Sequence, residues 1–333
     1  MRAPVLAAAF IVALTSCQED RESPTAPEAE PALATSNTWM QKRSLTPWRM
    51  FMAAGTINGV IYVVGGRGRE SATLRRVDAY HVTTNTWSQV APLPAARARP
   101  NGASMINGKL YVTGGSNRDY KWTKTLFVYD PGTNSWTRKA DMPRPSCDGD
   151  QGVIAGQLYV YTGCPISANM GAVFFRYNPA TDTWVKRAAP PTDHFSGAGT
   201  AVGGRFYLGG GYRECTECGE PGITINTYSF HAYNPSTNTW ATKPSIASHT
   251  ASGMAAAAMN GKLWFAGGVG WEFQSDELQV YDPMANTWVS KAPLPIQASS
   301  GAAAMAGGKL FYISGLEWLE PTDTPSWVYA YTP

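Results

Sequence analysis

One pattern repeats through most of the chain and limits its fold more than any other feature. A Trp that follows Asn or Asp and then Ser or Thr recurs about every 50 residues. An apolar run ending in Gly and a Tyr in an alternating run recur in the same phase. Three markers with one period indicate six copies of one structural unit. The markers are Trp39, Trp87, Trp136, Trp184, Trp240 and Trp288; Gly66, Gly115, Gly163, Gly211, Gly268 and Gly315; Tyr80, Tyr129, Tyr177, Tyr233, Tyr281 and Tyr331.

Each repeat predicts four short strands. The first strand is rich in Ala and Gly, which suits strands crowded around an axis. Tight turns such as Asn58-Gly59 lead into an apolar second strand, because two-residue hairpins need positive φ. The third strand alternates, and a turn such as Asp130-Pro131 leads to a fourth strand with outward Lys or Arg. Four-stranded units at this period predict the blades of an all-β propeller.

The Gly-Gly pair after the second strand, the Tyr of the third and the Trp of the fourth resemble the kelch repeat. The resemblance covers residues 37–333, although the pair becomes Thr162-Gly163 in the third repeat and Ser314-Gly315 in the sixth. It implies a six-bladed kelch β-propeller. In such a fold the repeated Trp, Tyr and Gly residues serve packing between blades.

The sixth repeat has three strands and no terminal Trp strand of its own. A strand of the fourth type, around Trp39, instead stands alone before the first repeat. We therefore expect this N-terminal strand to complete the last blade. Ring closure removes the open edge that a linear array would expose.

The N-terminus resembles an export signal. Arg2 precedes an apolar run at residues 3–15, which is too short to span a bilayer as a helix. The run ends at Cys17 in a sequence that resembles a bacterial lipobox. This predicts a signal peptide at residues 1–16, and a lipidated Cys17 with a disordered tether at residues 17–36. The implied location is the bacterial cell envelope, at the outer membrane or cell surface; the alternative is an ordinary secretory signal.

The composition excludes several classes of partner. The net charge is +3 with 15% charged residues, too small and balanced for a nucleic-acid surface. No other apolar stretch is long enough for a transmembrane helix, so the membrane contact is the lipid anchor alone. We expect a monomer without a cofactor, and the four His residues make a His-rich metal centre improbable.

Candidate binding residues lie on the loop-rich face of the expected propeller. The loops between second and third strands and the connections between blades emerge on this one face, whereas the opposite face has only tight turns. Aromatic, Arg and acidic side chains on these loops form the mixture that binds sugars, peptides or protein surfaces. Packing of the loops on each other is the alternative. The candidates are Arg67, Arg97, Arg99, Tyr120, Trp122, His194, Tyr212, Arg213, Trp271, Phe273 and Trp318, with Asp148 on a connection between blades.

Two classes of function remain open. The chain has no phosphate-binding Gly-rich loop, GxSxG or HExxH motif, so no catalytic residues are assigned. The first interpretation is a non-catalytic binding or scaffolding module for a protein or glycan on the loop-rich face. The second is a propeller enzyme acting on a carbohydrate, similar to a sialic acid epimerase or a sugar oxidase. An acid–base set converging in one pocket would favour the enzyme.

The cysteines predict disulfides in an oxidising compartment. If Cys17 is lipidated, four remain, which allow three pairings. The hairpin turn at Ala155-Gly156 places Cys147 opposite Cys164, within disulfide range. Cys215 and Cys218 then form a short CxxC bridge, with a redox or zinc role as the alternative. A bridge between Cys164 and Cys215 is the main competing pairing.

Overall fold

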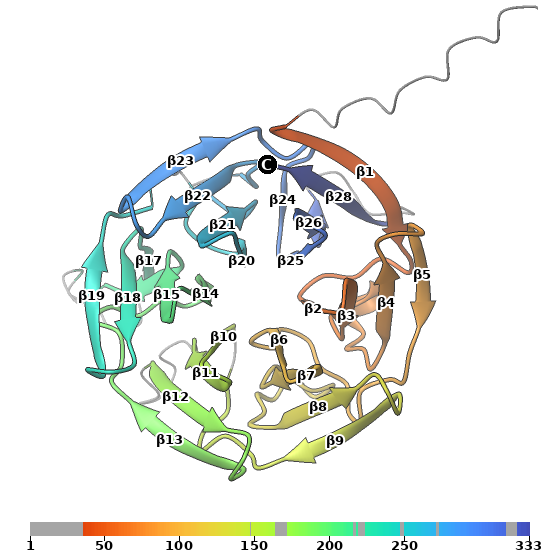
Figure 1. Ribbon diagram of the computed structural model, residues 1–333, viewed down its shortest axis with the longest axis horizontal. Helices are drawn as coiled ribbons and strands as arrows, with labels where there is room; N and C mark the ends of the chain where they lie inside the picture. The colour runs from red at the N-terminus through yellow and green to blue at the C-terminus, as the bar shows by residue number, and fades with distance from the viewer. Residues whose placement is uncertain are drawn as a thin grey trace, which may run out of the picture. The chain divides into compact units, whose positions relative to one another are not determined.

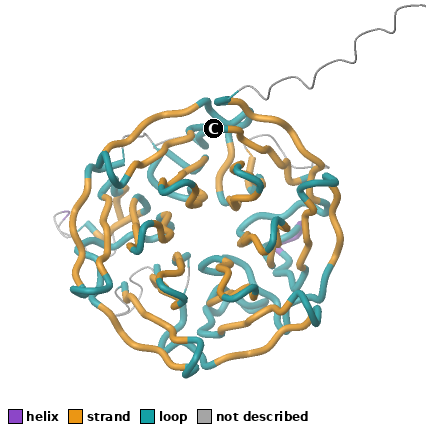
Figure 2. Tube along the Cα trace, viewed as in Figure 1, coloured by secondary structure: helices purple, strands orange, loops and turns teal. Residues whose placement is uncertain are grey.

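The computed structural model describes residues 36–146, 148–163, 172–215, 218, 224–246, 250–270, 273–317 and 325–333. Within the unit from Thr35 to Pro333, six four-stranded antiparallel sheets stand around a central axis (Figure 1). The predicted all-β, six-bladed propeller is confirmed. Figure 2 shows the innermost strands surrounding an axial space.

Each blade runs from an inner to an outer strand, here a to d. Blades 1 to 3 contain β2 (Ala53–Ile57), β3 (Val60–Val64), β4 (Val77–His81) and β5 (Thr86–Gln89); β6 (Ala103–Ile106), β7 (Lys109–Thr113), β8 (Leu126–Asp130) and β9 (Ser135–Lys139); β10 (Asp150–Ile154), β11 (Gln157–Thr162), β12 (Val173–Asn178) and β13 (Thr183–Arg187). Blades 4 to 6 contain β14 (Ala198–Val202), β15 (Arg205–Gly209), β18 (Phe230–Asn234) and β19 (Thr239–Lys243); β20 (Ala255–Met259), β21 (Lys262–Ala266), β22 (Leu278–Asp282) and β23 (Thr287–Lys291); β25 (Ala302–Ala306), β26 (Lys309–Ile313), β28 (Ser326–Thr332) and β1 (Thr38–Leu45). Short extra elements are η1 (Arg69–Ser71), the pair β16 (Tyr212–Glu214) and β17 (Thr224–Asn226), and the pair β24 (Ala298–Ser299) and β27 (Leu316–Glu317).

The N-terminal strand closes the ring, as the sequence predicts. β1 pairs with β28 in antiparallel register, with Trp39 opposite Tyr331. Trp39 is only partly buried, whereas Tyr331 is fully buried. The Trp of this strand therefore covers the outer rim, and the Tyr beneath it belongs to the core.

A repeated latch explains the Asn/Asp–Ser/Thr–Trp motif. In blade 2 the Trp136 indole N–H donates to the Ala91 carbonyl oxygen at 2.8 Å, and Ala91 belongs to the chain leaving blade 1. Asn134 Oδ1 accepts from the Ala91 N–H at 2.9 Å and from the Tyr129 hydroxyl at 2.8 Å. Asn134 has φ +47°, a left-handed conformation that Asn tolerates better than most residues. The motif thus holds each blade to the preceding one.

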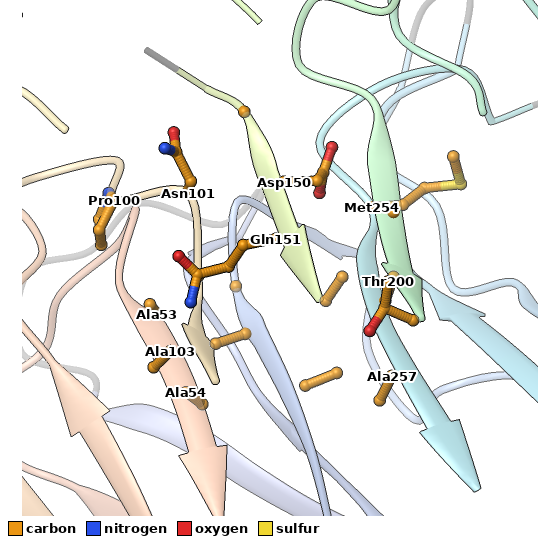
Figure 3. A pocket seen from close by; sticks show the side chains of 18 of the residues that line it. Ala53, Ala54, Pro100, Asn101, Ala103, Asp150, Gln151, Thr200, Met254 and Ala257 are labelled. Carbon is orange, nitrogen blue, oxygen red and sulfur yellow. The ribbon is translucent and has the colours of Figure 1, made fainter. Parts of the chain in front are cut away.

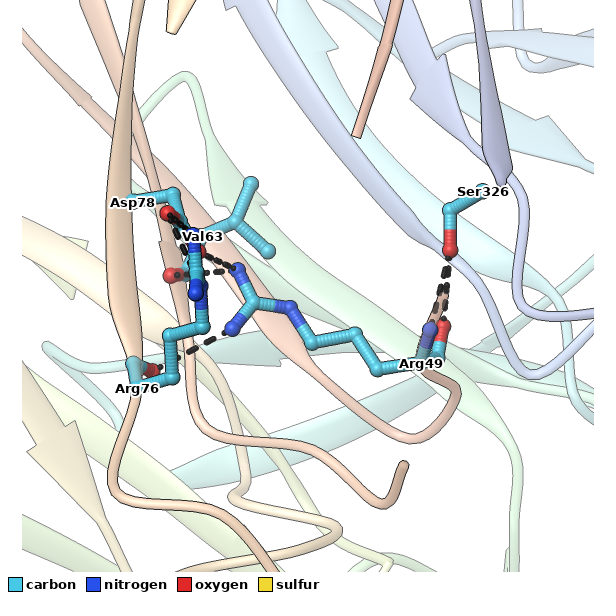
Figure 4. Close-up of polar contacts among 5 residues, drawn as sticks. All are labelled: Arg49, Val63, Arg76, Asp78 and Ser326. Atoms are coloured by element: carbon cyan, nitrogen blue, oxygen red, sulfur yellow. Dashed lines mark hydrogen bonds and ion pairs between the residues drawn. The ribbon is translucent and has the colours of Figure 1, made fainter. Parts of the chain in front are cut away.

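A buried ion pair lies at the seam between blades 6 and 1 (Figure 4). Arg49 is fully buried, and its Nη2 lies 2.6 Å from Asp78 Oδ2 on β4. The Arg49 backbone N–H donates to Ser326 Oγ on β28, and Arg76 also binds Asp78. Burial lowers the pKa of Arg49 to about 10, while the charge of Asp78 opposes that shift. The same Arg therefore ties the closing blade to the first.

The predicted signal peptide and Cys17 lie outside the described residues, as does the tether up to residue 35. Among the residues that the structure describes, no helix is long and apolar enough to cross a bilayer.

Candidate functional site

A pocket of about 790 Å³ occupies the axis of the propeller, and the a strands line it (Figure 3). Most of its wall consists of Ala, Gly, Ser and Thr, so the strands approach closely and leave an open channel. Among the described residues, the charged side chains in this wall are Arg99, Asp148 and Asp150. The charged groups of the described wall are therefore concentrated on blades 2 and 3.

A ring of equivalent residues forms the mouth of this channel on the loop-rich face. Each residue precedes strand a of its blade, and each has φ between +43° and +64°. Arg99 N–H donates to the Phe51 carbonyl at 2.8 Å, and Phe51 N–H donates to the Ser300 carbonyl at 2.9 Å. In the same way, the Ser300 N–H donates to the Gly253 carbonyl, and the Gly253 N–H donates to the Ser196 carbonyl. We call Phe51, Arg99, Asp148, Ser196, Gly253 and Ser300 the mouth ring.

Side chains of the mouth ring extend into a ladder of stacked Arg and aromatic groups. The Arg99 guanidinium lies 3.6 Å from the ring centre of Phe51 and forms an ion pair with Asp148. The Arg67 guanidinium lies 6.0 Å from the ring centre of Phe51 and 4.8 Å from that of Tyr120. We call Tyr120, Arg67, Phe51, Arg99 and Asp148 the Arg–aromatic ladder. It runs from a loop of blade 2 across blade 1 to the mouth of the channel.

Arg67 differs from Arg99 in that its charge is not matched. The Arg99 guanidinium binds Asp148, whose Oδ2 also accepts from the Ser196 hydroxyl at 3.1 Å. Within the described parts of the chain, the Arg67 guanidinium has stacking contacts but no hydrogen bond or ion pair, and its Nε is buried. A guanidinium held between aromatic rings with free N–H groups is suited to planar acceptors such as carboxylates.

The channel wall also holds an acidic side chain that sequence reasoning missed. Asp150 begins β10, and its Oδ2 has no hydrogen-bond partner in the described structure. Burial raises the pKa of Asp150 well above its usual value, the charge of Asp148 raises it further, and the Gly199 N–H opposes both. Aligned repeats could have revealed it, because an acidic residue stands where the other a strands carry Ala or Gly.

The structure brings together five of the candidates named from the sequence, one of which is Asp148 in the ladder. Arg67, Arg99 and Tyr120 lie in the ladder, and Tyr212 lines the channel with its hydroxyl 2.9 Å from Ser252 Oγ. Phe51 was not among the candidates. The six mouth-ring residues share no residue type, so the sequence repeats do not mark this position.

Other candidates lie elsewhere. His194 is fully buried between blades 3 and 4, where Nδ1 is 2.8 Å from the Gly210 carbonyl, and burial lowers its pKa to about 4. Arg97 is also buried and contacts Thr125. These two side chains belong to the core and not to the channel surface. Trp122, Arg213 and Phe273 lie outside the channel wall, and Trp271 and Trp318 are outside the described residues.

The structure tests one of the predicted disulfides. Cys215 and Cys218 form the predicted disulfide at the end of β16. Cys147 and Cys164 lie outside the described residues. The hairpin register on which their pairing was predicted is present, with Asp150 opposite Tyr161. In the part of the chain described here, no three His, Cys, Asp or Glu side chains cluster as a metal site would require.

The blades, the closing strand and the repeated Trp, Tyr and Gly positions define a kelch-type β-propeller. A model of the KLHDC2/KLHL20/DRC7 Kelch-repeats domain matches residues 102–315, and a Kelch motif model matches residues 49–94. The chain therefore belongs to the kelch-repeat family.

Two individual proteins illustrate how far the likeness extends. The human Kelch repeat and BTB domain-containing protein 6 is 39% identical over 59 residues, which are 17% of this chain and 9% of that protein. The chain thus spans a small part of that relative's length. The solved structure titled "Structure of YjhT" superposes with a TM-score of 0.67 at 17% identity, covering 86% of this chain and 94% of the other. This second likeness shows the fold alone.

Proposed function

We propose that the protein is a non-catalytic binding module that takes a protein or glycan partner at the mouth of the axial channel. The unmatched Arg67 guanidinium carries this proposal. Two aromatic rings hold the Arg67 guanidinium without neutralising its charge. Its buried Nε–H lacks an acceptor, which costs free energy unless a partner supplies one. The partner group we expect at Arg67 is a carboxylate or another planar anion.

The test is a peptide and glycan array probed with residues 30–333. We expect ligands with acidic groups, and we expect Arg67→Ala to weaken their binding about 30-fold, as for a hot-spot side chain. Arg118→Ala is the matched control, because it removes a positive charge from an exposed blade 2 loop outside the ladder. Equal binding by both variants and the wild type would place the site elsewhere.

The alternative is a propeller enzyme acting on a carbohydrate, and Asp150 is the observation that favours it. A carboxyl group with a raised pKa in a channel is suited to acid–base chemistry. The other acidic residue of the described wall, Asp148, is already bound to Arg99 and Ser196, so a second free catalytic group is missing from that wall. Turnover of an array sugar, followed by proton NMR and abolished by Asp150→Asn, would support the enzyme.

We also propose that the module is exported to the bacterial envelope and lipid-anchored through Cys17. The sequence around Cys17 and the polar segment after it support this arrangement. Labelling cells with an alkyne fatty acid should mark the wild type and not Cys17→Ala. A labelled Cys17→Ala protein would contradict the anchor.

A further inference from the structure

Blade 3 breaks the pattern of the channel wall at one position. The register of the inner hairpins makes Asp150 equivalent to a small residue in every other blade. These residues are Ala53, Gly102, Ala198, Ala255 and Ala302. The fold therefore accepts a side chain without charge at this point, and an Asp here has no evident packing purpose.

Neighbouring blades leave room for the two large side chains at the start of β10. A Cβ on Gly102 would lie 2.7 Å from Gln151 Cγ, and a Cβ on Gly199 would lie 3.2 Å from Asp150 Cβ. Figure 3 shows Gln151 on the side of blade 2 and Asp150 on the side of blade 4. The absence of side chains at both glycines gives this part of the wall its shape.

Within the described residues, only one of these two side chains has a partner for each of its side-chain oxygen and nitrogen atoms. Gln151 Oε1 accepts from the Thr113 hydroxyl at 2.7 Å, and its Nε2 donates to the Tyr111 carbonyl at 2.8 Å. Asp150 Oδ2 has no partner in the described structure. The Gly199 N–H binds the carboxyl group, but a buried carboxyl oxygen left without a partner is costly, so its retention points to a group supplied from outside.

The charge balance of the wall identifies that group. Arg99 is the cation of the described wall, and it is bound to Asp148. One carboxyl group is therefore in excess at the seam between blades 3 and 4, and one guanidinium, Arg67, is in excess at the other end of the ladder. The two unmatched groups, a carboxyl and a guanidinium, lie on either side of the matched Arg99–Asp148 pair in the chain of contacts.

We propose that Asp150 binds a positively charged group of the ligand, so that the channel mouth takes a peptide segment with an acidic and a basic side chain. This inference rests on the proposed binding function and deepens it. Arg67 receives the acidic group and Asp150 the ammonium or guanidinium group. A neutral glycan satisfies neither position, which favours a peptide as the partner.

The experiment measures binding of two capped tripeptides to the soluble protein by NMR, one with a central lysine and one with norleucine in its place. We expect the lysine peptide to bind at least about tenfold more tightly, and Asp150→Asn to remove this preference. Asp119→Asn is the control, because Asp119 is exposed on a blade 2 loop away from the channel wall. Equal affinity for both peptides, or an unchanged preference in Asp150→Asn, would overturn the inference.

Two further measurements keep this test separate from folding and from the proposed function. We expect Asp150→Ala to raise the melting temperature at neutral pH, because four other blades carry Ala at this position; a fall would assign Asp150 a structural role and overturn the inference. The lysine preference should grow as pH rises and Asp150 ionises. Its titratable neighbours are Asp148, two residues before β10, and Tyr161, opposite on β11. β14, from Ala198 to Val202, contributes no titratable group. A lost preference with intact Arg67-dependent array binding would refute this inference alone.

Discussion

The latch between blades can be tested by comparing the same substitution at equivalent positions of two repeats, so that one blade serves as the control for another. Asn134→Ala removes the acceptor for the buried Tyr129 hydroxyl and for the Ala91 N–H. Asn286 has the same place in blade 5 and accepts from the Tyr281 hydroxyl at 2.7 Å. Its counterpart of Ala91 is Pro244, which has no N–H to donate. Asn286→Ala therefore breaks one hydrogen bond where Asn134→Ala breaks two.

The expected costs follow from these bonds. An orphaned buried hydroxyl costs about 1–3 kcal/mol, and the additional amide bond contributes about 1 kcal/mol. Both positions have positive φ, +47° at Asn134 and +57° at Asn286, so the strain that Ala introduces is similar and cancels in the comparison. We expect the free energy of unfolding to fall by about 1 kcal/mol more for Asn134→Ala than for Asn286→Ala.

Urea denaturation followed by tryptophan fluorescence and by circular dichroism measures this difference. The two signals should give coincident transitions with one slope, so that the midpoints report stability. Equal losses in the two variants would show that the amide bond does not help to hold the blades. A loss near zero in both would refute the latch as a stabilising element.

Three other perturbations test the closure, the seam and the buried His. Removal of residues 1–43 should abolish cooperative melting because it deletes most of β1, while removal of residues 1–35 should leave the melting temperature unchanged; equal melting would refute closure. Arg49→Met should cost about 1.5–3 kcal/mol by urea denaturation, because the buried Asp78 loses one charged partner and keeps Arg76, and a neutral effect would contradict the seam. The pKa of His194 is lowered from 6.5 to about 4, so the stability linked to it is fully present above pH 6.5 and is lost as pH falls toward 4, by about 1.4 kcal/mol per pH unit. His194→Asn keeps a donor and does not titrate, so it should flatten this acid dependence; an unchanged slope would exclude His194 as its source.

The phase of the repeats predicted most of the fold. Tight turns such as Asn58-Gly59 fixed hairpin registers, and the extra strand around Trp39 predicted the closure that β1 and β28 form. Turns of this kind need particular backbone angles that few residues adopt, so the residues at the turn are enough to predict them. The burial of the repeated Trp residues was less predictable, because an outer strand exposes part of each indole.

The candidate site was only partly predictable. Its face and the residues Arg67, Arg99 and Tyr120 followed from loop position, but their stacking around Phe51 depends on side-chain directions that the sequence does not specify. His194 was misleading because a connection between blades can turn inward and bury its side chain. Asp150 was missed because it belongs to a strand, and its significance appears only when the six inner strands are aligned in register.

The central claim is that a partner binds at the channel mouth through the Arg–aromatic ladder. Hydrogen–deuterium exchange of the wild type, with and without a ligand from the array, tests it most directly. We expect slower exchange in the mouth ring and in the segments around Arg67 and Tyr120, with no change in the turns of the opposite face such as Asn107-Gly108. Protection confined to that opposite face or to the outer strands would contradict binding at the channel mouth.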